Sequence, residues 1–115
     1  MARAATTSDA FNAVAEPRRR DILAFLALDE RPVGAIVEAL EMGQPSVSKH
    51  LKVLREVGLV RVRRDGRHVY YRTNAPAIRP LHEWTGHFER LWQHQLLRVQ
   101  ERAEQMSEKE RGEKS

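Results

Sequence analysis

The sequence contains no cysteine. This absence excludes disulfide bonds, thiol redox chemistry and every metal site that depends on a thiolate ligand. It suits the reducing conditions of the cytoplasm, where we expect the protein to act. The sequence also lacks any apolar run close to the ~20 residues of a membrane-spanning helix, and its first ten residues lack the apolar segment of a secretory signal. We therefore expect neither a membrane partner nor export.

No catalytic arrangement of residues stands out either. The 115 residues, enough for one modest domain, include no serine–histidine–aspartate set, glycine-rich phosphate loop or paired carboxylates. An enzyme is therefore not expected. The charge, however, is unevenly placed: Lys and Arg outnumber Asp and Glu by 20 to 16, a net charge of +4, and residues 61–72 contain five arginines beside the single acid Asp65. Such a basic segment permits a polyanionic partner.

Four short helices are predicted in the first half of the chain. Apolar residues recur at helical spacing in each of them, and Glu16-Pro17 interrupts the pattern because the residue before a proline avoids the helical region. The fourth helix, residues 45–56, is expected to end at Gly58, since glycine is typical of helix C-termini. The helices are expected to begin at Ser8 or Asp9, Pro17, Val33 and Pro45.

The fourth helix has two distinct faces. Val47, Leu51 and Leu54 lie at i, i+4 and i+7 and form an apolar face, while serine and basic side chains point the opposite way. Residues 42–44 alone connect this helix to the third. Two short helices joined by a tight turn form a helix-turn-helix, whose second helix can lie in the major groove of DNA.

After Gly58 the apolar pattern changes to the alternation of β-strands. Residues 59–64 (LVRVRR) and 67–72 (RHVYYR) flank Asp65-Gly66, a frequent two-residue hairpin turn. The alternation gathers the apolar side chains on one face. The expected cross-strand pairs are Arg64–Arg67, Val62–Val69 and Val60–Tyr71.

A long final helix is predicted from about Ile78 to Met106. Its apolar residues recur at spacings of three and four, and they offer more apolar surface than one docking face on a small domain needs. A partner helix would cover the excess. Residues 8–106 are therefore expected to form one DNA-binding and dimerisation domain, and residues 107–115 a flexible charged tail.

The order of four helices, hairpin and long helix predicts a mainly α winged helix-turn-helix fold with double-stranded DNA as its partner. Gln and Ser side chains suit base edges, whereas basic side chains suit phosphates. Arg18, Arg19 and Arg20 either add phosphate contacts or pair with acids. The other expected DNA contacts are Gln44, Ser46, Ser48, Lys49, Lys52 and Arg55 on the fourth helix and Arg63, Arg64, Arg67 and His68 on the wing.

Three stretches of the chain resemble ArsR-type winged-helix repressors. They are residues 44–54 (QPSVSKHLKVL) followed by 58–60 (GLV), residues 63–67 (RRDGR) with Tyr70-Tyr71, and residues 16–23 (EPRRRDIL). The resemblance covers residues 9–105 and implies a homodimeric, cytoplasmic repressor that reads a near-palindromic operator. It also implies release by an effector or partner of unknown nature.

By the same resemblance, the first and last helices form the dimer interface. The apolar side chains of these helices are the expected contacts between the two copies. They are Phe11, Val14, Leu81, Trp84, Phe88, Leu91, Trp92, Leu96 and Val99.

The family includes metal sensors, whose ligand patterns can be compared with this chain. Sensors that use thiolates are excluded by the absence of cysteine. A second pattern, Asp-x-His followed by His-x-x-His or His-x-x-Glu, fails because Pro80 precedes His82 by two residues and Leu97 follows His94 by three. No metal cofactor is therefore expected. The remaining candidates on one face of the final helix are Glu83, His87 and His94.

Two alternatives to a metal-free repressor remain open. One is a metal-responsive repressor with a site on the final helix. The other is a winged-helix protein-interaction module in which the basic wing is only a solvated turn. The residues do not indicate the operator, the regulated genes, the effector or the choice between repression and activation.

Overall fold

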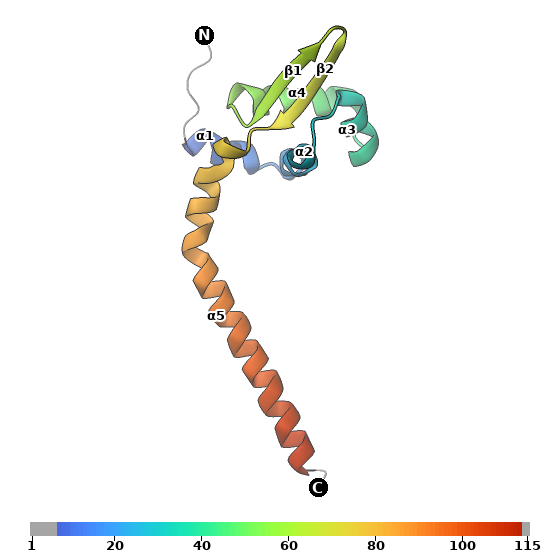
Figure 1. Ribbon diagram of the computed structural model, residues 1–115. Helices are drawn as coiled ribbons and strands as arrows, with labels where there is room; N and C mark the ends of the chain where they lie inside the picture. The colour runs from blue at the N-terminus through green and yellow to red at the C-terminus, as the bar shows by residue number, and fades with distance from the viewer. Residues whose placement is uncertain (1–6, 114–115) are drawn as a thin grey trace. The chain divides into compact units, whose positions relative to one another are not determined.

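The computed structural model describes residues 7–113. Four helices, an antiparallel hairpin and a long helix confirm the predicted winged helix-turn-helix fold. The chain divides into two units, one ending at Leu81 and the other beginning at His82. The elements are α1 Thr7–Val14, α2 Pro17–Leu28, α3 Val33–Leu40, α4 Gln44–Glu56, β1 Val60–Asp65, β2 His68–Thr73 and α5 Ala75–Glu113 (Figure 1).

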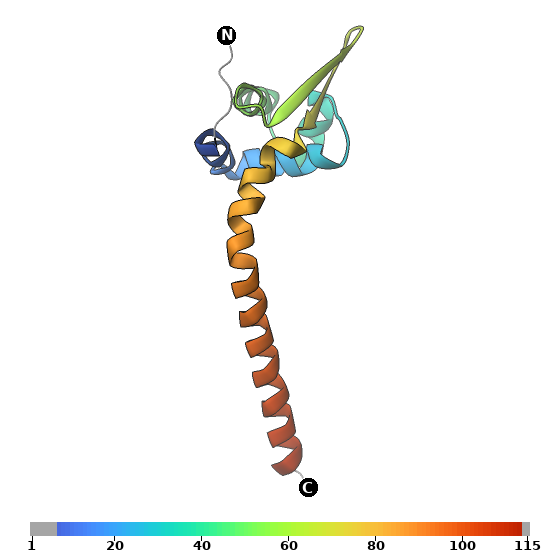
Figure 2. The ribbon, with the colours of Figure 1, turned by 60° about the vertical axis from the view of Figure 1, so that its left-hand side comes forward.

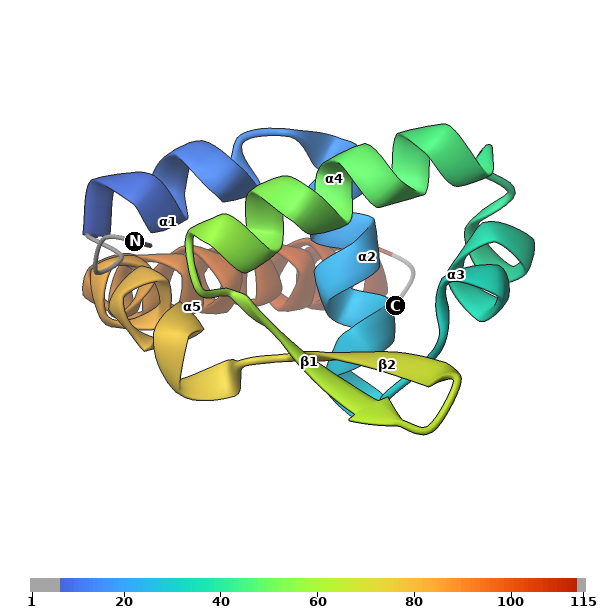
Figure 3. The ribbon, with the colours of Figure 1, turned by 90° about the horizontal axis from the view of Figure 1, so that it is seen from above.

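The core of the first unit lies beneath α4. Val47, Leu51 and Leu54 are at most 2% exposed, which confirms the apolar face predicted for this helix. They belong to one cluster of buried side chains with Ile22 of α2 and Ile36 of α3. Figure 3 shows α4 crossing α2, with α3 beside the beginning of α4. Burial of each such side chain stabilises the fold by roughly 1.5–3 kcal/mol, so the core sets which face of α4 meets solvent.

The turn between α3 and α4 depends on Glu41, which follows α3. Its φ of 52° lies in the left-handed region, where residues other than glycine are uncommon. The backbone N–H of Met42 donates to the carbonyl oxygen of Val37 at 3.2 Å, and the Met42 side chain is buried. These contacts offset the backbone strain. Helix α4 then begins at Gln44, one residue before the predicted Pro45.

The cross-strand pairs of the wing differ from the prediction by two residues. The turn lies at Gly66-Arg67, and the φ of Gly66 is +59°. A type II′ turn needs positive φ only at its first central residue, whereas a type I′ turn on Asp65-Gly66 would need it at Asp65 too. A two-residue shift preserves the alternation of side chains, so the predicted faces are correct although the pairs are wrong. The observed pairs include Val60–Thr73, Val62–Tyr71 and Arg64–Val69.

Strand β2 is also hydrogen-bonded along the edge that faces away from β1. The N–H and C=O groups of Tyr71 exchange hydrogen bonds with those of Arg31, each at 2.9 Å. At the end of the strand, the buried hydroxyl of Thr73 donates to the carbonyl oxygen of Leu23 at 2.7 Å. These bonds attach the base of the wing to α2 and to the segment between α2 and α3. The sequence pattern did not predict them.

The final helix α5 is longer than predicted. It continues past Met106 to Glu113, so most of the expected flexible tail is helical; residues 114–115 lie outside the described part of the chain. Residues 107–111 (SEKER) are mostly good helix formers without proline, which explains the extension. The helix also begins three residues early, at Ala75, because a proline is tolerated in a first helical turn.

Only the beginning of α5 packs on the core of the first unit. Ala77, Ile78 and Leu81 contact the buried cluster, whereas no side chain between His82 and Gly112 is buried. The second unit is therefore a helix with its side chains open to solvent. Among residues 7–113, no helix combines the length and apolarity that crossing a membrane requires.

Candidate nucleic-acid interface

The outer face of α4 carries the side chains predicted to contact DNA. Its three cations have no ion pair within residues 7–113. The first turn contains no acidic residue, and no side chain of the described residues caps it, so its N–H groups and dipole are open to an anion. The face therefore presents amide and hydroxyl groups near the N-terminus of the helix and cationic groups closer to its C-terminus. All its predicted contacts are exposed: Gln44, Ser46, Ser48, Lys49, Lys52 and Arg55.

The tip of the wing carries three more of the predicted contacts. Arg64, Arg67 and His68 are exposed beside the Gly66 turn. Figures 1 and 2 show that this turn extends beyond α3 and α4. Neither arginine of the tip forms an ion pair with another described residue. Two guanidinium groups at the far end of the hairpin are thus available to an anion.

Arg63 has a partner within the chain that the sequence did not predict. Its guanidinium donates to both carboxylate oxygens of Glu30, from Nε at 3.0 Å and from Nη2 at 2.5 Å. It also lies 4.7 Å from the centre of the Tyr70 ring and 3.8 Å from Asp65. Hydrogen bonds from Arg63 hold the pKa of Glu30 below its ordinary value. Arg63 therefore anchors the wing to the segment between α2 and α3, while its contact with DNA stays a prediction.

Replacing Arg63 by glutamine distinguishes a role in the wing from a contact with DNA. We expect the amides of the hairpin to exchange with solvent about threefold faster, because the anchor to Glu30 is lost. The dependence of DNA affinity on salt should hardly change, whereas Arg67→Gln should lower its slope by about 2 in a dimeric complex, because one cation is lost from each copy. Hydrogen exchange and DNA titrations at several salt concentrations measure the two effects. Equal salt slopes for the Arg63 and Arg67 variants would show that Arg63 also contacts DNA.

The arginines at the beginning of α2 serve the fold. Arg19 Nε donates to the carbonyl oxygen of Ala13 at 2.6 Å, and Arg20 Nη1 to that of Val14 at 2.7 Å. Both guanidinium groups thus lie at the C-terminal end of α1, where cations are favoured by the free carbonyls and the helix dipole. Arg18 pairs with an acid of its own helix at 3.6 Å. Phosphate contacts from these residues stay a prediction.

His50 lies on α4 between its buried and exposed faces. Its Nδ1 is buried without a hydrogen-bond partner in the described chain. Burial, together with the nearby charge of Arg19, lowers the pKa of His50. His50 therefore flanks the core, and no group of three potential metal ligands within residues 7–113 includes it.

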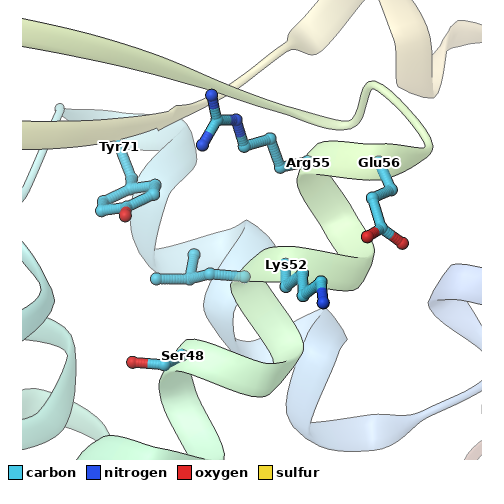
Figure 4. A pocket seen from close by; sticks show the side chains of 6 residues that line it. Ser48, Lys52, Arg55, Glu56 and Tyr71 are labelled. Carbon is cyan, nitrogen blue, oxygen red and sulfur yellow. The ribbon is translucent and has the colours of Figure 1, made fainter. Parts of the chain in front are cut away.

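A pocket of about 380 Å³ separates α4 from β2 (Figure 4). It includes Tyr71, which the sequence placed on the apolar face of the wing but not in the interface. The alternation of side chains along the strand could have revealed this position, because it puts Tyr71 on the same face as Val62 and toward α4. The pocket is lined by Ser48, Leu51, Lys52, Arg55, Glu56 and Tyr71.

The second unit exposes a large apolar surface. Trp84 and Phe88 meet edge to face at 5.2 Å, and Phe88 stacks on Trp92 at 6.2 Å between ring centres. Exposed apolar surface of this extent on one helix is typical of an interaction site. Leu81 and Val14, also predicted in the dimer interface, pack partly on the core of the first unit, and Phe11 is half-buried. The exposed predicted contacts are Trp84, Phe88, Leu91, Trp92, Leu96 and Val99.

The metal candidates do not come together in one chain. Glu83, His87 and His94 are exposed on α5. Within residues 7–113, no group of three His, Asp or Glu side chains is arranged to hold a metal ion. A metal site on this helix would therefore need ligands from a second copy.

Comparison with known proteins gives a consistent result. Residues 16–62 match the family model described as "Bacterial regulatory protein, arsR family". The chain is similar to the transcriptional repressor SdpR of Bacillus subtilis, with 30% identity over 81 residues, or 70% of this chain and 90% of SdpR. It is also similar to a probable mercury resistance operon repressor of Streptomyces lividans, with 38% identity over 76 residues, or 66% of this chain and 61% of that protein.

A solved structure agrees with the sequence relatives. Reduced HlyU from Vibrio cholerae has 30% identity and a TM-score of 0.59, and the match covers 71% of this chain and 86% of HlyU. HlyU is described as a transcriptional activator. The similar proteins thus include both repressors and an activator.

Proposed function

Because the chain belongs to the arsR family of bacterial regulatory proteins and is a DNA-binding transcriptional regulator, we propose that it is a homodimeric repressor of a near-palindromic operator. One observation carries this proposal: the polar outer face of α4 is held over a buried inner face, beside a wing whose tip bears two arginines that form no ion pair with another described residue. The family regulates transcription and is not enzymatic. We propose the cytoplasm, where bacterial DNA lies, as its place of action.

The proposed complex assigns different roles to different parts of the interface. Helix α4 lies in the major groove and the wing reaches the adjacent minor groove or backbone. Gln44 and Ser46 read base edges, because amide and hydroxyl groups match them, whereas the Ser48 hydroxyl suits either a base or a phosphate. The cations bind phosphates, which position the protein without reading sequence. The phosphate contacts are Lys49, Lys52, Arg55, Arg64 and Arg67, with His68 beside them.

A second copy of the chain is the proposed partner of α5. Residues 8–106 would then contain both the DNA-binding and the dimerisation surfaces. Two copies would place two recognition helices on two half-sites, which explains why a near-palindromic operator is expected. The exposed aromatic and aliphatic side chains of the two α5 helices would be covered in the dimer.

We propose no metal cofactor for this repressor. The mercury named for the Streptomyces lividans relative is not carried over, because soft metal ions select thiolates and this chain has no cysteine. Release from DNA would then depend on an effector or partner of another chemical class. Equilibrium dialysis against zinc tests the point, since stoichiometric binding would favour a site shared between two copies.

The proposal is tested by binding to the DNA upstream of the protein's own gene, against a scrambled duplex, over a salt series. Five cations per copy predict a log–log slope no steeper than about −9 for a dimer. We expect a preference of roughly a thousandfold for the upstream DNA. A steep slope without preference would place the operator elsewhere. Binding to neither duplex would favour the protein-interaction module.

Two variants separate base reading from phosphate binding in the same titration. Gln44→Ala is expected to weaken operator binding by roughly 1–3 kcal/mol per half-site and to leave scrambled DNA nearly unaffected, because a base contact is lost in each half-site. Arg67→Ala should weaken binding to both duplexes and lower the salt slope of the dimer by about 2, because one cation is lost from each copy. Equal losses on both duplexes from Gln44→Ala would rule out its role in reading bases.

A further inference from the structure

The space between α4 and the wing holds polar groups from both elements. Figure 4 shows the Arg55 guanidinium turned toward β2 and the Tyr71 ring, with the hydroxyls of Ser48 and Tyr71 on the same side of the helix. The amino group of Lys52 and the carboxylate of Glu56 point away from Tyr71. One cation and two hydroxyl groups therefore face the same space.

Tyr71 is held firmly in this position. Its backbone is hydrogen-bonded to Arg31 on one side, and it pairs with Val62 of β1 on the other. Its side chain is half-buried, and its hydroxyl makes no hydrogen bond to another residue of the described chain. A phenol that is already oriented loses little rotamer freedom when it donates a hydrogen bond to a ligand.

The geometry of DNA brings a sugar–phosphate strand to this space. In the proposed complex α4 occupies the major groove and the wing reaches the neighbouring minor groove. Each strand of a duplex separates one groove from the next, so the strand between these two grooves runs between α4 and the hairpin. The pocket of about 380 Å³ opens at that point.

We propose that the pocket between α4 and β2 binds one phosphodiester of the operator. Arg55 supplies the positive charge, and the hydroxyls of Tyr71 and Ser48 donate hydrogen bonds to the phosphate oxygens. Leu51, which is 2% exposed, forms an apolar floor that suits the adjoining deoxyribose. This inference rests on the proposed function and adds Tyr71 to the residues that contact DNA.

The variant Tyr71→Phe tests the site because it removes one oxygen and keeps the ring. We expect affinity for the upstream duplex to fall about tenfold at every salt concentration, with an unchanged slope, because no charge is lost. Tyr70→Phe removes the same atom on the opposite face of β2, where the ring lies against Arg63. This control should bind within about twofold of wild type. Arg55→Gln should lower the slope by about 2, because one cation is lost from each copy of the dimer.

A second measurement identifies the phosphate. Upstream duplexes that carry one uncharged methylphosphonate linkage at the same position of each half-site are compared for wild type and Tyr71→Phe. At one such position the two proteins should bind equally well, because the contact is already lost in both half-sites. At all other linkages the tenfold difference should persist. Thermal unfolding of both tyrosine variants verifies that the fold is retained.

The outcomes separate this site from the proposed function. Wild-type binding to the upstream duplex together with equal effects of Tyr71→Phe and Tyr70→Phe would overturn the phosphodiester site alone. A difference that no methylphosphonate linkage removes would also overturn it. Failure of the wild type to bind either duplex would overturn both proposals.

Discussion

Replacing Leu96 by glutamate is expected to separate the two copies of the proposed dimer. Leu96 is 68% exposed on α5, and burial of a leucine contributes roughly 1.5–3 kcal/mol. The substitution appears twice in a symmetric dimer, so the dimerisation constant should weaken at least about a hundredfold. Sedimentation over a range of concentrations measures this loss. Operator affinity should fall with it, because the two half-sites are no longer linked.

Leu97→Glu provides the matched control. Leu97 is also exposed, at 56%, but it lies about 100° further round the helix, beside the stripe formed by Trp92, Leu96 and Val99. The same change of side chain at this position should leave the dimer largely intact. Equal losses from the two variants would show that this stripe is not the dimer interface.

Replacing Leu54 by alanine is expected to cost the largest share of folding stability. Leu54 is fully buried on the inner face of α4, and removal of a buried leucine side chain costs about 2–5 kcal/mol. That is a large part of the roughly 5–15 kcal/mol that stabilises a typical domain. Urea unfolding should show a lower midpoint with a similar slope. The folded fraction should bind DNA nearly as well as wild type, because the outer face of α4 is unchanged.

Leu28→Ala is the control for this second variant. It is the same substitution on α2 at a side chain that is 89% exposed, so the free energy of unfolding should change by no more than about 0.5 kcal/mol. Similar losses from both variants would contradict the assignment of Leu54 to the core.

The two substitutions act on different requirements of one function. The buried face of α4 orients the recognition helix, and the exposed stripe of α5 brings two such helices together in the proposed dimer. Disruption of the buried face of α4 would reduce the amount of folded protein. Disruption of the α5 stripe would leave folded copies that bind single half-sites weakly.

Local patterns predicted the parts of the fold that depend on near neighbours. Spacings of three and four residues identified the inner face of α4, and alternation identified the two faces of the hairpin. The cross-strand pairs were wrong by two residues because the choice of turn depends on the backbone angles of Gly66. The faces remained correct because an even shift does not exchange them.

Local patterns failed where a side chain meets a distant part of the chain. Arg63 was grouped with the other arginines of the wing, yet it bonds to Glu30, which lies 33 residues earlier. Arg19 and Arg20 were considered for phosphate contacts, yet they bond to the carbonyls that end α1. In each case an arginine and its partner meet through the packing of elements, which spacing along the chain does not reveal.

The sequence by itself determined the order of the elements, the inner and outer faces of α4 and the exclusion of thiolate chemistry. Composition and periodicity suffice for these properties because they arise from each residue and its near neighbours. The tertiary structure alone decided which arginines remain open to DNA and how Tyr71 comes to face α4. Those properties depend on which surfaces of separate elements pack together, and folding brings residues from distant parts of the chain to the same place.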